Sequence, residues 1–334
     1  MKSSSLLLLL IMTFFIQGCA QKVSVKALEP AEISAASQTK NIAITKFYPD
    51  YVNLTDKVEA AISKQRIDGN SYFRVIDRSD FNKVIKEQKL QNSGLVDEST
   101  AVEVGSILGA QAIISGSVDQ PTLSDSHYYE ERTKCRGKGE ARQCWKIKVS
   151  CLKRSISLTA QIRMINVKTS AVIFADNIRR QQRWSRCADD SRTIPSKQAG
   201  AQYLANNIAN NFAYRLTPHY QYLSVTLLED PDMEYTDLQE RLLENALLYI
   251  EQSRYDKAEQ LLSRLIESTD SQSYVALYDL GVIYEARGDF TEAQHYYDGA
   301  DKLTIEPVEE INLAVNRIQR LIRNEKTAQA QIAQ

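Results

Sequence analysis

The chain has 334 residues, of which 43% are hydrophobic and 25% charged, a composition typical of folded proteins and a length sufficient for about two domains. Its 41 Lys and Arg nearly balance 42 Asp and Glu, and the net charge of -1 argues against nucleic-acid binding, which requires a basic surface. Only three histidines occur, His127, His219 and His295, in unrelated segments. We therefore expect no metal, no cofactor and no catalytic site, and a binding or assembly protein rather than an enzyme.

The amino terminus has the features of a secretory signal over residues 1–18. Lys2 precedes an apolar stretch over residues 6–16, shorter than the ~20 residues that a membrane-spanning helix needs. Gln17-Gly18-Cys19 then resembles the lipobox of bacterial lipoproteins. The resemblance implies cleavage before Cys19, attachment of diacylglycerol and an N-acyl chain such as palmitate to it, and, because Ala20 follows, a place at the periplasmic face of the outer membrane. A plain signal peptide with a chance cysteine is the alternative.

Residues 19–40 are polar and rich in small side chains, which suits a flexible segment. We predict that they form a lipidated tether. No later segment approaches ~20 consecutive apolar residues, so we expect no membrane-spanning helix.

Residues 41–228 are predicted to form a domain in which strands and helices alternate. Such alternation indicates a sheet with helices packed on it. The predicted strands cover residues 41–47, 73–78, 110–118, 155–165 and 220–228, the last pairing at the sheet edge, and the predicted helices cover 54–67, a segment through Phe81, 97–108 and a segment between Pro195 and Pro218.

A series of short motifs follows one order through this domain: Ile42-Ala43-Ile44, residues 73–78, Glu87-Gln88 with Gly94, Ala101 with Gly105, Gly109-Ala110 before residues 114–118, and residues 158–167 with Thr169. Together they resemble the curli assembly and transport lipoproteins of the CsgG type, over residues 41 to about 216. The resemblance implies ring oligomers in the periplasm. In the curli exporter, each subunit also contributes two hairpins to an outer-membrane pore.

Four further cysteines lie close together in the sequence: Cys135, Cys144, Cys151 and Cys187. An even number in an exported protein favours disulfides, and no Cys-x-x-Cys spacing supports a redox or metal motif. The sequence leaves three pairings open, with four unpaired thiols as the alternative. We expect the bridges to hold a loop-rich insertion within residues 121–154.

Two insertions lie where the curli exporter has its membrane hairpins, and neither is apolar enough for the same role. Residues 186–197 are polar and too short for two crossings. Residues 121–150 carry many charged side chains, among them Asp125, Glu130, Glu131, Arg132, Lys134, Arg136, Lys138, Glu140 and Arg142. We therefore expect no pore, with an export channel as the alternative.

Residues 236–325 are predicted to form helical repeats of the tetratricopeptide kind, in two copies offset by 35 residues. A closing helix is expected over residues 309–322, with a frayed tail after Asn324. Such stacks usually bind a segment of another protein in a groove, and we take Tyr278, Arg287 and Tyr296 as exposed candidate anchors. The alternative is that the repeats only pack on the first domain or on a neighbouring subunit. The second copy matches the repeat at Leu277, Leu280, Gly281, Tyr284, Ala293, Tyr297 and Ala300.

The predicted fold is α+β: an α/β sandwich of CsgG type, in which helices pack on a mixed sheet, followed by the helical repeats. The predicted function is that of an outer-membrane-anchored periplasmic scaffold for assembly or secretion. It would recruit a protein partner in the cell envelope and form homo-oligomers. The alternative is a curli-type export channel subunit. No GxSxG, HExxH or phosphate-binding glycine loop occurs in the sequence, which argues against an enzyme.

Overall fold

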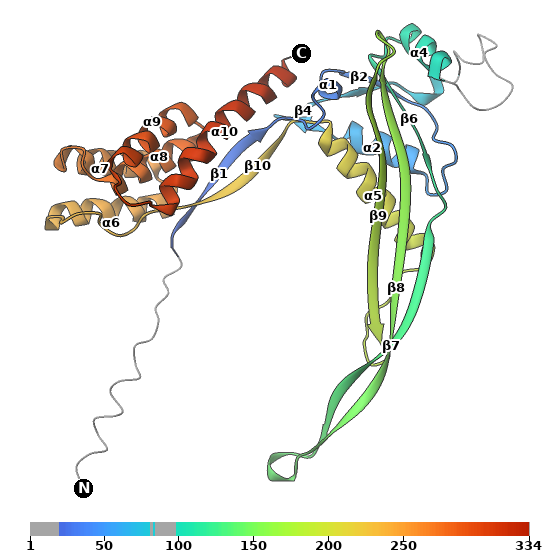
Figure 1. Ribbon diagram of the computed structural model, residues 1–334, viewed down its shortest axis with the longest axis horizontal. Coiled ribbons are helices and arrows are strands. Elements are labelled where there is room, and N and C mark those ends of the chain that lie inside the picture. Colours follow the sequence, from blue (N-terminus) through green and yellow to red (C-terminus); the bar gives the residue numbers. More distant parts are fainter. Residues whose placement is uncertain (1–19, 81–82, 84–97, 334) are drawn as a thin grey trace. The chain divides into compact units, whose positions relative to one another are not determined.

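The computed structural model describes residues 20–80, 83 and 98–333 (Figure 1). It divides into two compact units. Of the described residues, the α/β unit comprises those within 30–219 and 328–333, and the helical unit comprises residues 20–29 and 220–327. The predicted lipidation site Cys19, the predicted helix at Phe81 and the motif at Glu87-Gln88 and Gly94 lie outside the described residues.

The α/β unit is built on one mixed sheet. Its strands follow the order β5-β2-β6-β8-β7, and β9 pairs with β8 as well. The strands β5, β2 and β6 run parallel, whereas β8 is antiparallel to β6, β7 and β9. The sheet consists of β2 (Asn41–Ile44), β5 (Arg74–Val75), β6 (Ala112–Val118), β7 (Thr122–Arg136), β8 (Gln143–Asn166) and β9 (Val172–Cys187).

One face of this sheet carries the main core, beneath α2 (Leu54–Ser63) and α5 (Lys197–Arg215). Every second residue of β8 from Ile156 to Met164 is buried there, as the alternating sequence predicts for a strand with one buried face. The helix α5 begins where the Ser196 hydroxyl accepts a hydrogen bond from the Ala199 N–H. The predicted helix between the two prolines is therefore confirmed.

Among the described residues, α4 (Glu98–Ile107) covers the other face near β2 and β6. A small cluster there contains Val104, Ile113 and Val167. Gly116 in β6 has no room for a side chain, because an added Cβ would lie 2.4 Å from the Gln161 carbonyl oxygen. The remaining short elements of this unit are α1 (Ser34–Ser37), β3 (Arg66–Ile67), β4 (Asn70–Ser71) and the 3-10 helix η1 (Gly139–Ala141).

The predicted loop-rich insertion is wrong. Residues 122–136 and 143–154 instead lie in the two long strands β7 and β8, and β9 runs beside β8 as a third strand that we did not predict (Figure 1). The tip of the β7–β8 hairpin is exposed on both faces, so its sequence lacks the apolar alternation that marks a half-buried strand. Main-chain pairing holds these residues in strands without that pattern.

The helical unit contains two antiparallel helix pairs and a closing helix, as the repeat spacing predicts. Gly281 lies against the Tyr297 ring, where an added Cβ would come within 2.7 Å of two ring carbons, so the two helices approach closely at this point. The closing helix continues past the predicted frayed tail, and Ala328 and Gln331 are buried. The helices are α6 (Asp237–Glu251), α7 (Tyr255–Ser268), α8 (Tyr274–Arg287), α9 (Phe290–Leu303) and α10 (Glu309–Ile332).

The predicted tether is also wrong, because residues 22–29 form the strand β1 (Lys22–Glu29). It pairs with β10 (His219–Thr226) in a separate two-stranded sheet, so β10 does not extend the main sheet. Val23, Val25 and Ala27 alternate along β1 and are buried in the same core as α8. None of the helices in the described ranges is both long and apolar enough to cross a bilayer.

Candidate functional site

Two disulfides join neighbouring strands of the ribbon formed by β7, β8 and β9. Cys135 on β7 is bonded to Cys144 directly opposite on β8, with 4.1 Å between their Cα atoms. Cys151 on β8 is bonded to Cys187 directly opposite on β9, with 3.9 Å between the Cα atoms. Of the three pairings that the sequence left open, this is the one in which the two cysteines of each bridge lie directly opposite each other on adjacent strands.

The ribbon narrows from three strands to two at the second disulfide. Because β9 ends at Cys187, residues 129–150 continue as a two-stranded hairpin, which we call the hairpin tip (Figure 1). Every residue from 131 to 146 is exposed. The turn uses Gly137 and Gly139, both at positive φ (95° and 58°), where other residues would be strained.

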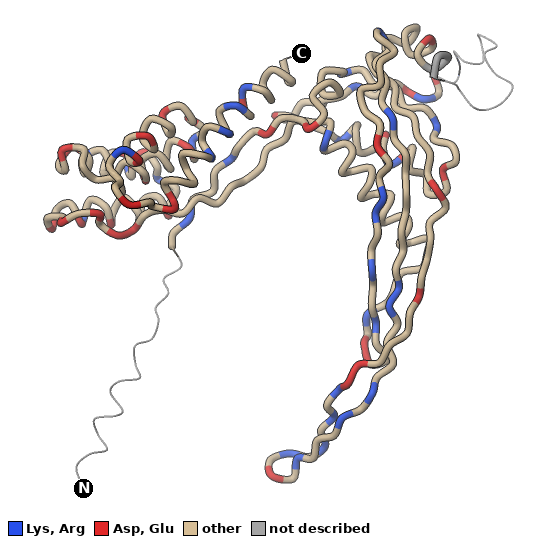
Figure 2. Tube along the Cα trace, in the orientation of Figure 1, with Lys and Arg blue, Asp and Glu red and all other residues tan. Residues whose placement is uncertain are grey.

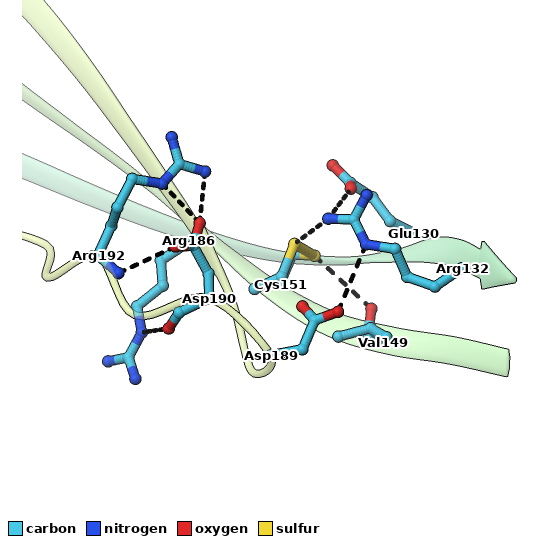
Figure 3. Close-up of a disulfide and its surroundings, with 9 residues drawn as sticks. Glu130, Arg132, Val149, Cys151, Arg186, Asp189, Asp190 and Arg192 are labelled. Atoms are coloured by element: carbon cyan, nitrogen blue, oxygen red, sulfur yellow. Dashed lines mark hydrogen bonds and ion pairs between the residues drawn. A yellow bond between two sulfur atoms is a disulfide. The ribbon is translucent and has the colours of Figure 1, made fainter. Parts of the chain in front are cut away.

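Ion pairs surround the Cys151–Cys187 bridge (Figure 3). The Arg132 Nη2 lies 2.8 Å from a Glu130 carboxylate oxygen, and its Nε lies 3.5 Å from Asp189 Oδ2, in the segment after β9. In that segment, Asp190 accepts hydrogen bonds from the side chain and backbone N–H of Arg192, which lower the pKa of Asp190 to about 2. The Arg132–Asp189 ion pair thus connects β7 to the segment that follows β9.

One group of potential metal ligands comes together in the described residues, and it does not fit a metal ion. The carboxylate of Glu130 and the sulfurs of Cys151 and Cys187 lie within 4.8 Å of one another. The two sulfurs are bonded to each other, however, and so neither is a thiolate that could coordinate a metal.

Charge is strongly segregated along the chain, which the net charge of -1 conceals (Figure 2). Residues 129–197 contain 17 Lys and Arg against 6 Asp and Glu, a net charge of +11. Residues 229–327 contain 22 Asp and Glu against 10 Lys and Arg, a net charge of -12. The ribbon is therefore a basic surface and the helical unit an acidic one. Counting charge by segment, rather than over the whole chain, would have revealed both.

The ribbon also has a face made of polar residues, on the side of β8 that points away from α5. Arg154, Ile156, Leu158 and Ala160 of β8 lie on the side of the strand that faces α5, so their neighbours in the sequence and the residues opposite those neighbours share the other face. All members of this face are exposed or half-buried. This polar face consists of Ser117, Asp119, Thr122, Ser124, Ser126, Lys153, Ser155, Ser157, Thr159, Gln161, Asn177, Arg179, Gln181, Arg183 and Ser185.

The polar face contains eight hydroxyl, three amide, three basic and one acidic side chain, and none of these described residues is aromatic or aliphatic. Some of its groups bond to one another across strands: the Thr122 and Ser157 hydroxyls lie 2.6 Å apart, and Gln181 Nε2 donates to the Ser155 hydroxyl. Within the described ranges, Arg179 and Arg183 form no ion pair. Their guanidinium groups are available to an anion from outside.

The prediction that Tyr278 is an exposed anchor is wrong. Its side chain is 1% exposed, and its hydroxyl donates a hydrogen bond of 2.7 Å to the Thr226 carbonyl oxygen of β10. Val275 and Val282 on α8 are also buried, in a core that includes Val23 and Val25 of β1. This side of α8 is thus filled by the chain's own β1 and β10, and it is not an open groove.

The other two predicted anchors lie at the surface but have partners within the helical unit. The Tyr296 ring is stacked on Tyr284, with ring centroids 5.3 Å apart and planes inclined by 8°. The Arg287 Nη1 lies 2.5 Å from Glu259 Oε2, and the Tyr284 hydroxyl donates to the other oxygen of the same carboxylate. Arg287 and Tyr296 therefore help to join α7, α8 and α9.

Two acidic side chains of α8 are buried, and their burial was not predicted from the sequence. Glu285 accepts two hydrogen bonds from Arg317 of α10, at 2.7 and 2.8 Å, and another from the Tyr297 hydroxyl. Asp279 accepts one hydrogen bond of 3.0 Å from the Leu228 N–H, whereas its Oδ2 has no partner in the part of the chain that the structure describes. Burial raises the pKa of Asp279 well above its usual value.

The chain has a mixed sheet with packed helices, and antiparallel helix pairs follow in the sequence. It is therefore an α+β protein with a C-terminal helical region. A family model described as "Curli production assembly/transport component CsgG" matches residues 22–208, more than half of the chain. The chain belongs to the CsgG family. The match begins at β1 and contains the whole disulfide-bonded ribbon, so both are part of the family domain in this chain.

Solved structures give weaker similarities. The C-terminal domain of LpoB from Salmonella enterica is 13% identical, with 46% of this chain and 96% of that chain covered and a TM-score of 0.26. A PelC dodecamer from Paraburkholderia phytofirmans is 14% identical, with 59% and 97% covered and a TM-score of 0.23. At these values we take nothing about function from either structure. A comparison with the curated proteins finds no significant match.

Proposed function

We propose that this member of the CsgG family is a lipid-anchored scaffold at the periplasmic face of the outer membrane, where it serves assembly or secretion by binding other components. The observation that carries the proposal is the exposed, charged hairpin tip. Its 22 residues contain seven Lys and Arg and three Asp and Glu. Moving such side chains from water into hydrocarbon costs several kcal/mol each, so the tip is suited to water or to a charged surface.

The lipid anchor on Cys19 would hold the helical unit close to the membrane. Only Ala20 and Gln21 separate Cys19 from β1, and β1 is fixed in the core of that unit. Three residues span at most about 10 Å. Acylation of Cys19 therefore gives a short connection rather than a long flexible tether.

Partner recruitment would use the exposed acidic sides of the helices, because the side of α8 that faces β1 is filled. On α6, Glu240, Glu244 and Leu248 are all exposed and follow one another at a spacing of four residues, which places them on one face. An apolar residue beside acidic ones suits a basic, amphipathic segment of a partner protein. The CsgG family resemblance additionally favours homo-oligomers.

A capture experiment tests this role. The membrane-extracted full-length protein is cross-linked and its partners are identified by mass spectrometry, for the wild type and for a variant with Glu240→Lys, Glu244→Lys and Leu248→Lys. The matched control is Asp301→Lys with Glu306→Lys, which also reverses exposed acidic residues of the helical unit. A partner lost only from the α6 variant supports the proposal, and capture of no partner, or equal loss from both variants, contradicts it.

The export channel is the competing function. Recordings from the purified protein in planar lipid bilayers separate the two. Stable unitary conductance that depends on residues 129–150 would show that the protein is a channel subunit and not a scaffold. Absence of conductance, together with a partner found in the capture experiment, supports the scaffold.

A further inference from the structure

The polar face of the ribbon is chemically different from every other surface described above. It is three strands wide and combines basic with hydroxyl and amide side chains, whereas on the opposite side Ile156, Leu158 and Ala160 of the central strand β8 are buried in the core beneath α5. Nothing in the core explains why these positions are hydroxyl- and amide-rich. Basic side chains outnumber acidic ones by three to one on this face, and its one acidic residue, Asp119, lies just beyond the end of β6.

The composition selects among possible ligands. Protein interfaces are centred on apolar and aromatic side chains, and proteins that bind single-stranded nucleic acid stack bases on aromatic rings. The polar face has neither. Hydroxyl and amide groups both donate and accept hydrogen bonds, as the hydroxyls of a sugar chain require, and arginine binds carboxylates through two parallel hydrogen bonds. Sugars that carry carboxylates match both kinds of group.

The geometry suits an extended ligand. Along β8, the face runs from Lys153 to Gln161, eight residue steps or about 27 Å. Arg179 and Arg183 lie on the same face of β9, about 13 Å apart along the strand. The strand β8 is paired on both sides, and the Cys151–Cys187 bridge fixes the end of the face near the tip. A rigid, preformed surface of this kind loses little entropy when a ligand binds.

We propose that the polar face binds an acidic polysaccharide, with Arg179, Arg183 and Lys153 contacting its carboxylates and the surrounding Asn177 and Gln181 amides contacting its hydroxyls. This binding site goes beyond the scaffold role and does not depend on the partner of the helical unit. Charge complementarity brings the polymer to the ribbon, and the hydroxyl and amide groups distinguish a sugar chain from other polyanions.

The test measures binding of the full-length, detergent-solubilised protein to immobilised polygalacturonate, at about 150 mM salt so that long-range attraction is screened. The face variant is Arg179→Gln with Arg183→Gln. The matched control is Lys138→Gln with Lys148→Gln, which removes the same charge from exposed positions of the hairpin tip. We expect the face variant to bind about tenfold more weakly and the control to change by about twofold or less. All four side chains are exposed, and circular dichroism checks that each variant is folded.

A second comparison separates a polysaccharide site from a general anion site. Asn177→Ala with Gln181→Ala leaves the charge unchanged, and it should weaken binding to polygalacturonate but not to poly-glutamate. Three results overturn the proposal: no binding of polygalacturonate by the wild type, equal loss in the face and control variants, or poly-glutamate or single-stranded DNA bound as tightly as polygalacturonate. The last result would identify an acidic protein segment or a nucleic acid as the ligand instead.

Discussion

Cys151 and Cys187 lie directly opposite each other on β8 and β9, at the row where the ribbon narrows from three strands to two. The bridge thus bonds the last residue of β9 to β8. Val149, with partial cover from Tyr128 and Ile147, packs around the two sulfurs as a small separate core. The second bridge, Cys135–Cys144, lies instead near the end of the exposed hairpin tip.

The two bridges are therefore expected to differ in their effect on stability. The Cys151–Cys187 bridge spans 36 residues and the Cys135–Cys144 bridge spans 9. A chain-entropy model gives a stabilisation of the folded state of about 4 kcal/mol for the first bridge and about 2.5 kcal/mol for the second. The tip can open locally without exposing the main core. We expect Cys151→Ser with Cys187→Ser to lower the thermal midpoint of the α/β unit clearly, whereas Cys135→Ser with Cys144→Ser only speeds hydrogen exchange at the tip. Equal thermal midpoints for the two double variants would contradict this assignment.

The sequence predicted the elements whose burial is periodic. The strand around Ile156 to Met164 and the helices of the repeats each bury one face, so their apolar residues recur every two residues in the strand and about every 3.6 residues in the helices. The hairpin tip buries neither face, and so nothing in its sequence distinguishes a strand from a loop. The alternating Val23, Val25 and Ala27 of β1 did carry a signal, but the polar residues between them gave the segment the composition of a tether.

The candidate site was less predictable than the fold. Tyr278 was expected to be exposed, and no local pattern in the sequence shows that β1 and β10 fill this side of α8. The polar face contains residues from four strands, and only the register in which these strands pair places the residues next to one another. Its Arg179 and Arg183 lie in β9, a strand that we did not predict. Segment-by-segment charge was the one signal in the sequence that pointed to the ribbon.

Gly281 and Gly299 provide a matched test of the repeat packing. Both are glycines inside helices, but an added Cβ at Gly281 would lie 2.7 Å from Tyr297 ring carbons, whereas at Gly299 it would lie 3.7 Å from the nearest atom of Leu277. We expect Gly281→Ala to lower the free energy of unfolding by about 1–3 kcal/mol through overpacking. Gly299→Ala should raise it by about 0.5–1 kcal/mol through helix propensity. Urea denaturation measures both, and a stabilising Gly281→Ala would contradict the close helix contact.

The Glu285–Arg317 pair gives a test of the contact between α8 and α10. Glu285 is fully buried, and Arg317 bonds to both of its oxygens. Arg317→Met leaves a buried carboxylate without its cation, and we expect a loss of about 3–5 kcal/mol in the free energy of unfolding. Glu285→Gln added to Arg317→Met removes that charge and should recover most of the loss. If the double variant is as unstable as Arg317→Met alone, the arginine acts by packing rather than by charge.

Asp279 should make the stability of the helical unit depend on pH. Burial raises the pKa of this carboxyl in the folded protein, so between its unfolded pKa of about 3.9 and the raised folded value the folded state holds a proton that the unfolded state has released. Unfolding is therefore favoured as the pH rises, by at most about 1.4 kcal/mol per pH unit. The asparagine of Asp279→Asn cannot ionise, so the free energy of unfolding of this variant, relative to that of the wild type, should increase as the pH rises above about 4. Urea denaturation at several pH values from about 4 upward measures this difference. The exposed Asp301→Asn serves as the control and should show no such trend. A constant difference between Asp279→Asn and the wild type across the pH range would mean that Asp279 ionises normally in the folded state.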